Sequence, residues 1–163
     1  MKKLLILYHT ITGGSLQMAH AALAGARHET DVNSSLVHAS KVTPATLLDA
    51  DGYLFVSPEN LGSMSGIMKD MFDRCYYPVL DRLNGRPCAV MVCAGSDGHG
   101  AARQFDRILQ GLRLKQVVPS LIVITHAQTQ AAISSPKRLK SEDQEACSRV
   151  GETLACGMAN AMF

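Results

Sequence analysis

Apolar residues alternate along the chain between two patterns, and together these patterns predict strands that alternate with helices. Short apolar runs bounded by turn residues are typical of strands buried on both faces of a sheet. Four such runs and one weaker alternating segment are present: Lys3–Tyr8, Asp31–Val37, Gly52–Ser57, Arg86–Ala94 and Val117–Thr125. The polar residues of Asp31–Val37 indicate a sheet edge, and Pro119 indicates a bulge or a break near the start of the last strand.

Between these runs, apolar residues recur at the spacing of one helix face. The predicted helices are Ser15–Arg27, Pro44–Asp49, a segment through Ile67, Met71 and Cys75, a segment through Ala101, Phe105, Ile108 and Leu112, and a last segment that runs to Met158. Thr43 has the form of an N-cap before Pro44, and Ser141-Glu142-Asp143-Gln144 has the form of a capping box. Five strands, each followed by a helix, predict one α/β domain over residues 1–163, with a parallel sheet between helical layers.

Composition narrows the possible partners and the compartment. With 47% apolar residues, 18% charged residues and a net charge of +2, the 163-residue chain suits an ordinary globular domain. That charge gives no reason to expect nucleic acid or a membrane surface as a partner. The apolar run before His9 is too short for a signal peptide, so we expect a cytoplasmic protein.

Cysteine and lysine positions add two further interpretations. Five cysteines without a CxxC spacing indicate buried thiols in a reducing compartment, and no Cys/His pair has the spacing of metal ligands. The one dense basic run, Lys137, Arg138 and Lys140, is interpreted as a solvated loop before the last helix.

The loop after the first strand has the composition of a phosphate site. Ligands of open α/β sheets bind outside the carboxyl ends of the strands. In the first loop (His9–Ser15), hydroxyl groups of Thr10, Thr12 and Ser15 surround two glycines and precede a helix. Backbone amides, neutral donors and the helix N-terminus suit a phosphomonoester held without lysine. No Walker A sequence is present. The alternative to a phosphate site is that the first loop is a plain strand-to-helix turn.

Two further glycine-rich loops follow predicted strands. The second loop (Ser57–Gly66) could present backbone amides and carbonyls to the edge of a flat heterocycle, while Met64 could cover a ring or fill the core. In the third loop (Ala94–Gly100), Asp97 could either cap the next helix or contact a ligand. His99 could donate a hydrogen bond to an anionic ring or to a substrate oxygen, or could be a solvated loop residue.

Together, the three loops resemble those of the flavodoxin-like FMN-binding family. Thr10–Ser15 is similar to the family's phosphate loop, and the Gly-Ser-Met-Ser-Gly sequence of residues 62–66 and the His99-Gly100 pair resemble those of WrbA-like NAD(P)H:quinone oxidoreductases and NADPH-dependent FMN reductases. The resemblance implies an α/β/α sandwich with a five-stranded parallel sheet in the order 2-1-3-4-5. It implies FMN as cofactor and NAD(P)H as co-substrate.

The resemblance also implies which residues form the site. The cofactor-binding residues that we expect are Thr10, Ile11, Thr12, Gly13, Gly14, Ser15, Pro58, Glu59, Asn60, Leu61, Gly62, Ser63, Met64, Gly95, Ser96, Asp97 and His99. His99 is also the candidate catalytic residue, as a contact to substrate. The chain has no Trp, and no aromatic residue occurs in the second or third loop, so we expect a second subunit of a homodimer or homotetramer to cover the flavin ring.

Three functions are compatible with these features. The hypothesis that we favour is an FMN-dependent oxidoreductase that passes electrons from NAD(P)H to a quinone-like, flavin or other small acceptor. The alternative is a non-enzymatic electron carrier, which the slightly positive charge and the absence of Trp disfavour. A third is a module that binds a phosphorylated small molecule other than FMN.

Overall fold

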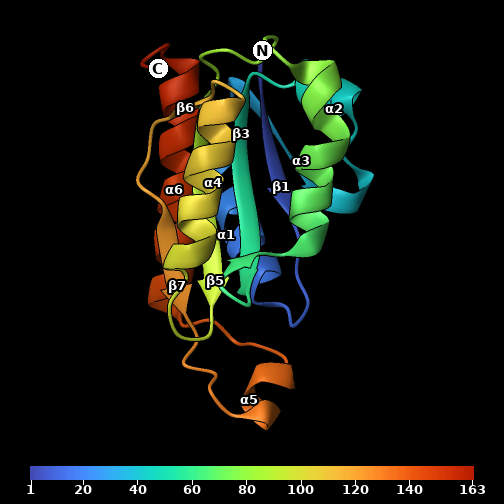
Figure 1. The fold of residues 1–163 in the computed structure, drawn as a ribbon. Helices are drawn as coiled ribbons and strands as arrows, with labels where there is room; N and C mark the ends of the chain where they lie inside the picture. Colours follow the sequence, from blue (N-terminus) through green and yellow to red (C-terminus); the bar gives the residue numbers. More distant parts are fainter.

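A parallel sheet covered by helices on both faces forms the body of the structure (Figure 1). The computed structural model describes residues 1–163. The strands are β1 (Lys2–Tyr8), β2 (Val32–His38), β3 (Gly52–Asn60), β4 (Ser63–Met64), β5 (Pro87–Ala94), β6 (Lys115–Gln116) and β7 (Leu121–Ile124). The helices are α1 (Gly14–Ala26), the 3-10 turn η1 (Ala39–Lys41), α2 (Pro44–Asp49), α3 (Gly66–Val79), α4 (His99–Gly111), α5 (Gln130–Ser134) and α6 (Ser141–Ala159). None of these helices is both long and apolar enough to cross a membrane.

The strand order β2-β1-β3-β5-β6 confirms the predicted 2-1-3-4-5 topology, with β5 as the fourth strand. The fifth position is shared by two short strands. β6 pairs with the start of β5 through Pro87 and Lys115, whereas β7 pairs with its end through Ala94 and Ile124. The break between them contains Pro119, as predicted, because proline has no amide hydrogen for a sheet ladder.

Each central strand is apolar throughout because alternate side chains enter different halves of the core. Leu4 and Ile6 of β1 pack on one side with α1 and α6, while Leu5 and Leu7 pack on the other with α2, α3 and α4. The same division applies along β3 and β5, where Met91 lies on the α1/α6 side. This two-sided burial explains why the predicted strands read as continuous apolar runs.

Helices α1 and α6 approach each other closely at two glycines. A Cβ atom on Gly25 would lie 2.0 Å from the carbonyl oxygen of Ser148, and one on Gly151 would lie 2.0 Å from that of Ala22. Any side chain at these positions would therefore push the two backbones apart. This contact fixes α6, the last helix of the chain, against α1.

Several local predictions differ from the structure. Thr43 caps α2 as expected, but Ser141 does not cap α6, because Lys140 is the N-cap residue and no side chain caps the helix there. The Gln144 side chain instead donates a hydrogen bond to the Leu139 carbonyl. The short helix α5 is not predicted by the sequence pattern. It projects beyond the carboxyl ends of the strands (Figure 1).

Candidate functional site

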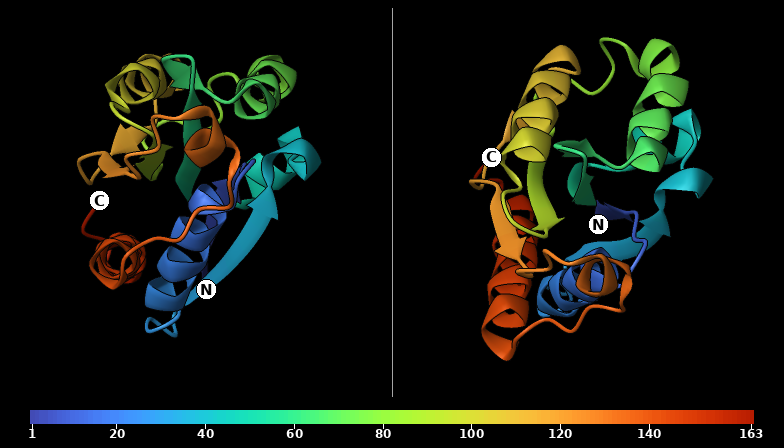
Figure 2. Two further views of the ribbon diagram at one scale, coloured as in Figure 1. Left: turned by 90° about the horizontal axis from the view of Figure 1, so that it is seen from below. Right: turned by 60° about the horizontal axis from the view of Figure 1, so that its bottom comes forward.

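Loops after β1, β3, β5 and β7 meet at the carboxyl edge of the sheet and enclose a pocket of about 190 Å³. Figure 2 shows these loops and α5 gathered at that end of the molecule. The pocket is lined by Thr10, Ile11, Thr12, Gly14, Ser15, Pro58, Glu59, Asn60, Cys93, Ala94, Gly95, Thr125, Ala127, Ile133 and Lys137. Most of the residues predicted in the first loop and at the start of the second are among them.

Glycine geometry shapes the first loop. Gly13 is the N-cap of α1 and has φ +89°, a left-handed conformation that favours glycine over other residues. The Gly13 amide donates to Thr10 Oγ1 at 3.0 Å, which closes the loop on itself. The first-turn amides of α1 have no partners within the helix and therefore face the pocket end as free donors.

Ser15 provides the clearest sign that this loop is built to hold a ligand. Its side chain is 2% exposed, and its Oγ atom has no nitrogen or oxygen hydrogen-bond partner, with only the weakly accepting Cys93 thiol beside it. A buried hydroxyl without a partner carries a free-energy cost that a ligand oxygen in the pocket would remove. Beside it, a Cβ atom on Gly14 would lie 2.5 Å from Cys93 Sγ, so the backbone approaches the pocket floor closely. These features fit the terminal phosphate of FMN.

The pocket floor contains a thiol that stays protonated. Burial raises the pKa of Cys93 to about 11, against the opposing effects of the nearby Lys137 charge and the adjacent Ser15 hydroxyl. The Cys75 thiol in α3 is also buried, and burial raises its pKa as well. A raised pKa keeps both thiols in the weakly nucleophilic form, so neither has the character of a reactive cysteine.

The second loop is a β-hairpin rather than an irregular loop. β3 extends to Asn60 and pairs antiparallel with β4, and Leu61 at the turn has φ +52° and is fully exposed. Gln104 Oε1 of α4 accepts hydrogen bonds from the Met64 amide at 2.8 Å and from Ser63 Oγ at 2.9 Å. The hairpin is thus fixed to α4, and Met64 is buried in the core, which is the second of the two roles considered for it.

Glu59 connects the second loop to the third. Its Oε1 accepts a hydrogen bond from the Gly98 amide, and its Oε2 accepts one from the Ala101 amide, each at 2.9 Å. The carboxylate therefore closes the N-terminal end of α4, where a negative charge is favourable. The sequence suggests Asp97 as a possible cap, whereas the N-cap residue is Gly98 and it makes no side-chain cap.

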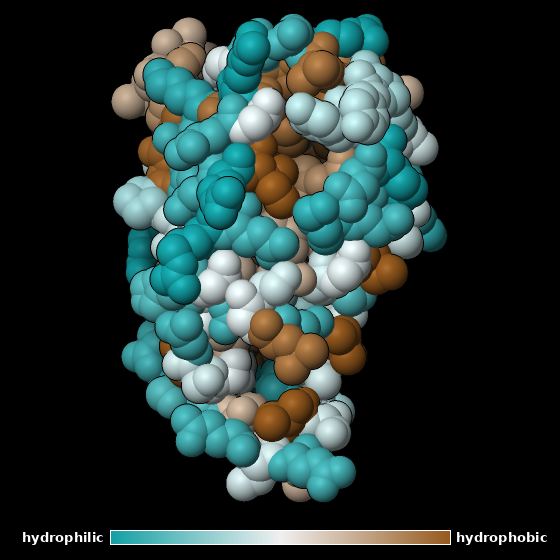
Figure 3. All heavy atoms as spheres, in the orientation of Figure 1, coloured by the Kyte–Doolittle hydropathy of each residue, from teal (hydrophilic) through white to brown (hydrophobic).

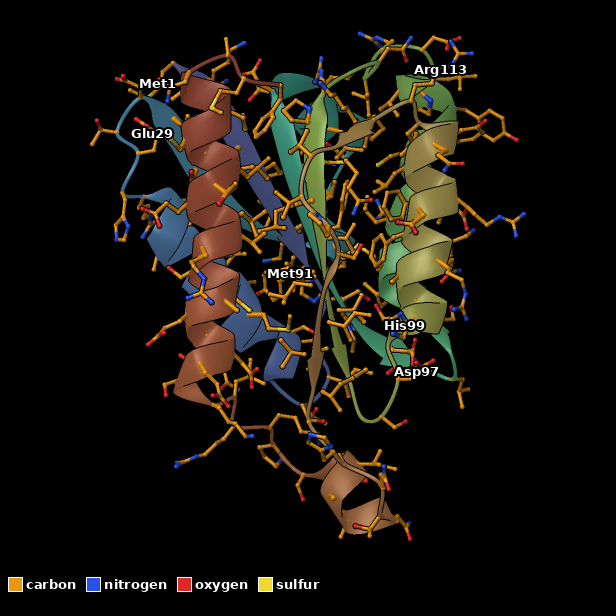
Figure 4. The ribbon with its side chains drawn as sticks, turned by 90° about the vertical axis from the view of Figure 1, so that its left-hand side faces the viewer. Met1, Glu29, Met91, Asp97, His99 and Arg113 are labelled. Carbon is orange, nitrogen blue, oxygen red and sulfur yellow. The ribbon has the colours of Figure 1, made fainter.

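The third loop lies beside the pocket, and only part of it lines the pocket wall. Gly95 lines the pocket, while Ser96, Asp97 and His99 lie outside the lining set. Figure 4 shows Asp97 and His99 at the end of α4 that lies next to the loops. Gly13 and the hairpin residues Leu61, Gly62, Ser63 and Met64 also lie outside that set. The structure therefore brings the phosphate-loop residues together more completely than the residues expected around the ring.

Residues 126–139, which we term the arch, supply a fourth side that the sequence did not reveal. The arch links β7 to α6, contains α5, and contributes Ala127, Ile133 and Lys137 to the pocket. The sequence pattern indicates a solvated loop for the basic run and a site without lysine for the first loop. The run does form a loop before α6, and Arg138 and Lys140 are exposed, but the chain returns to the first loop at Lys137, whose amide donates to the Thr12 carbonyl at 2.8 Å.

Comparisons with known proteins agree with this geometry. Residues 16–129 match the profile of the NADPH-dependent FMN reductase family. The chain belongs to that family. A flavodoxin of Aquifex aeolicus is 29% identical over 159 residues, which cover 95% of this chain and 86% of the relative. An NAD(P)H dehydrogenase (quinone) of Acidithiobacillus ferrooxidans is 29% identical over 94 residues, covering 45% of this chain and 47% of that protein.

Solved structures support the fold independently. A WrbA-like flavodoxin from Agrobacterium tumefaciens superimposes with a TM-score of 0.72 at 14% identity and covers 99% of both chains. An archaeal flavodoxin has a TM-score of 0.74 at 16% identity and covers 97% of this chain and 99% of its own. The predicted flavodoxin-like fold is therefore confirmed, and membership of the reductase family confirms FMN as the expected cofactor.

Proposed function

We propose that this FMN reductase family member is an oxidoreductase that transfers electrons from NAD(P)H to a quinone-like, flavin or other small acceptor. The observation that carries the proposal is the buried Ser15 hydroxyl, which has no nitrogen or oxygen partner, in a loop of neutral donors at the carboxyl edge of the sheet. Bound FMN would supply the redox chemistry, since flavins accept a hydride and pass electrons onward. The chain's own residues bind, orient and enclose the cofactor.

Distinct parts of the pocket suit distinct parts of FMN. Thr10, Thr12 and Ser15, with the first-turn amides of α1, would hold the phosphate by hydrogen bonds. Pro58, Asn60 and the Gly95 region would lie along the ribityl chain and the ring edge, where backbone groups can pair with polar ring atoms. We retain Leu61, Gly62 and Ser63 as contacts to the ring, because the hairpin that carries them borders the pocket through Asn60.

His99 remains our proposed substrate contact. It is the first residue of α4 and lies outside the pocket wall, where an incoming nicotinamide or quinone could reach it. We expect His99→Ala to slow the reduction of bound FMN by NAD(P)H and to leave the dissociation constant for FMN unchanged. His28, whose side chain is 67% exposed, provides the matched control. Equal reduction rates in both variants would remove His99 from the mechanism.

An exposed apolar rim supports the proposal that a second subunit completes the site. Ile11 is 66% exposed, Ile133 is 56% exposed, and both line the pocket, while Leu61 lies at the neighbouring hairpin. Figure 3 shows brown, apolar atoms at the surface of this lower end. We expect light scattering to give a dimer or tetramer that Leu61→Asp weakens. A monomer at micromolar concentration would contradict this part of the proposal.

The competing function is a non-enzymatic electron carrier, and the similarity to a flavodoxin over nearly the whole chain favours it. Anaerobic mixing of the FMN-loaded protein with NADPH or NADH separates the two functions. We expect either nucleotide to bleach the flavin absorbance within seconds, and a quinone to restore it. Bleaching by dithionite but by neither nucleotide would favour the carrier. A protein that stays colourless with added FMN would exclude both.

We further propose that the protein acts in the cytoplasm. All five cysteines are free, and four of them are buried. Free thiols persist in reducing compartments, which is also where NAD(P)H is available.

A further inference from the structure

The arch is attached at both ends to the loops that form the pocket. Just before its start, the Thr125 amide and Thr125 Oγ1 donate to the Ala94 carbonyl at 2.8 and 3.2 Å. The Ala127 carbonyl oxygen lies 2.9 Å from the position of a Cβ atom on Gly95, so the arch then passes close to the third loop. At its far end, the arch reaches the first loop. It therefore spans the pocket from one loop to the other, as Figure 2 shows from below.

Gln17, in the first turns of α1, holds the far end of the arch in place. Its Nε2 donates to the carbonyls of Gly13 at 3.0 Å and Lys137 at 2.7 Å. Its Oε1 accepts a hydrogen bond from the Leu139 amide at 3.1 Å. With the Lys137–Thr12 backbone bond, these contacts hold the Lys137 backbone against the first loop and the start of α1. The position of the Lys137 backbone therefore does not depend on α5.

Lys137 is the one cationic side chain that lines the pocket. Its Cβ and Cγ atoms lie 3.5 and 3.6 Å from the position of a Cβ atom on Gly14. Its Nζ donates to the carbonyl oxygens of Ala132, Ile133 and Ser135 at 2.8, 2.9 and 2.6 Å. All three partners are neutral, and Lys137 takes part in none of the salt bridges of the protein. Its positive charge is therefore not neutralised by any carboxylate.

No other pocket residue could neutralise an anionic ligand at the first loop. Thr10, Thr12 and Ser15 are neutral donors, and the only other charged residue of the pocket, Glu59, is occupied at the end of α4. The Lys137 charge already acts inside the pocket, because it opposes the rise in the pKa of Cys93 on the floor. A phosphate dianion in this half-buried position would be attracted to that charge more strongly than it would be in water.

We propose that Lys137 pairs with the terminal phosphate of FMN and gives the site its preference for phosphorylated flavin over riboflavin. The inference rests on FMN binding at this pocket and not on the proposed reductase activity. An ammonium group has three hydrogens, and all three are donated to carbonyls of the arch, so pairing with phosphate exchanges one carbonyl for a phosphate oxygen.

The test compares two ligands that differ only in the phosphate. The dissociation constants of FMN and riboflavin are measured by flavin fluorescence quenching on the full-length apoprotein. We expect Lys137→Met to weaken FMN binding about 10- to 100-fold, which is typical of losing one partly buried charge contact, and to change riboflavin binding less than about twofold. Arg138→Met removes the same charge from an exposed neighbour and should leave both constants unchanged. Lys137→Arg should retain most of the FMN affinity.

Each other result would overturn the proposal. Equal loss of FMN and riboflavin in Lys137→Met would mean that the lysine only supports the packing of the arch. Unchanged FMN affinity in that variant would mean that neutral donors suffice. Failure of the parent protein to bind FMN more tightly than riboflavin would reject the phosphate site itself. Because no NAD(P)H is present, these outcomes are independent of whether the protein is a reductase, and far-UV circular dichroism confirms that each variant is folded.

Discussion

Replacing Glu59 tests whether the second and third loops are held together by one carboxylate. The carboxylate accepts two hydrogen bonds of 2.9 Å at the N-terminal end of α4, from Gly98 and Ala101. Glu59→Gln keeps one carbonyl oxygen but turns an NH₂ group toward one amide and removes the charge. Glu59→Ala removes both acceptors. The exposed Asp97, which lies just before the same helix, provides a matched control in Asp97→Asn.

The size of the effect follows from the two hydrogen bonds. A hydrogen bond to a charged group contributes about 1.5–3 kcal/mol net, and the charge at a helix N-terminus adds about 0.3–1 kcal/mol. Because Glu59 is half-buried, the lower values apply. We expect Glu59→Gln to lower the free energy of unfolding by about 2 kcal/mol and Glu59→Ala by about 3 kcal/mol. Asp97→Asn should change it by less than about 0.5 kcal/mol.

Urea denaturation followed by circular dichroism measures these differences directly. For a protein of this size, about 2 kcal/mol corresponds to a fall of roughly 4–8 °C in the melting temperature. If Glu59→Gln and Asp97→Asn destabilise the protein equally, the Glu59 carboxylate does not hold the second and third loops together. A larger effect of Asp97→Asn would restore the interpretation of Asp97 as the helix cap.

Three further predictions address packing, ionisation and the phosphate site. Gly151→Ala should lower the free energy of unfolding by more than about 2 kcal/mol, because its Cβ atom would collide with α1 at the α1–α6 contact. Gly111→Ala, which has open space around it, should not lower it, and similar urea midpoints for the two variants would refute the packing argument. Burial raises the pKa of Cys88 from 9.0 to about 12, so the thiol ionises first in the unfolded chain, and the free energy of unfolding should fall above pH 9 by up to about 1.4 kcal/mol per pH unit. Unfolding curves at about pH 8–10 should show a shallower fall of this free energy in Cys88→Ala than in the parent protein. Thr12→Ala combined with Ser15→Ala should weaken FMN binding more than about tenfold in a fluorescence titration, and unchanged binding would reject the first loop as the phosphate site.

The arrangement of strands could be predicted because its causes are local. Parallel strands buried on both faces require continuous apolar runs, and the runs in β1, β3 and β5 have no competing helical spacing. Loops after successive parallel strands must then meet at one edge of the sheet. For this reason, the sequence pattern alone predicts that the first loop and the start of the second lie together, and Thr12 and Pro58 do line one pocket.

Other features depend on residues that are distant in the sequence. Glu59 reaches Gly98, and Lys137 reaches Thr12, across separations that no local pattern records. The hairpin of β3 and β4 was also missed, because two-residue strands are too short for a detectable alternation of polar and apolar residues.

The sequence by itself determined the α/β class, the strand order implied by the family resemblance, and a loop of neutral donors after β1. Only the tertiary structure decided which side chains face that loop. The path of the arch is set by Gln17 and by the packing of α6 on α1, and these contacts bring Lys137 to the first loop. The charge of a binding site depends on all the residues that are near it in space. Lys137, the one cation that lines this pocket, is distant from the first loop in the sequence, so no local pattern predicts its place there.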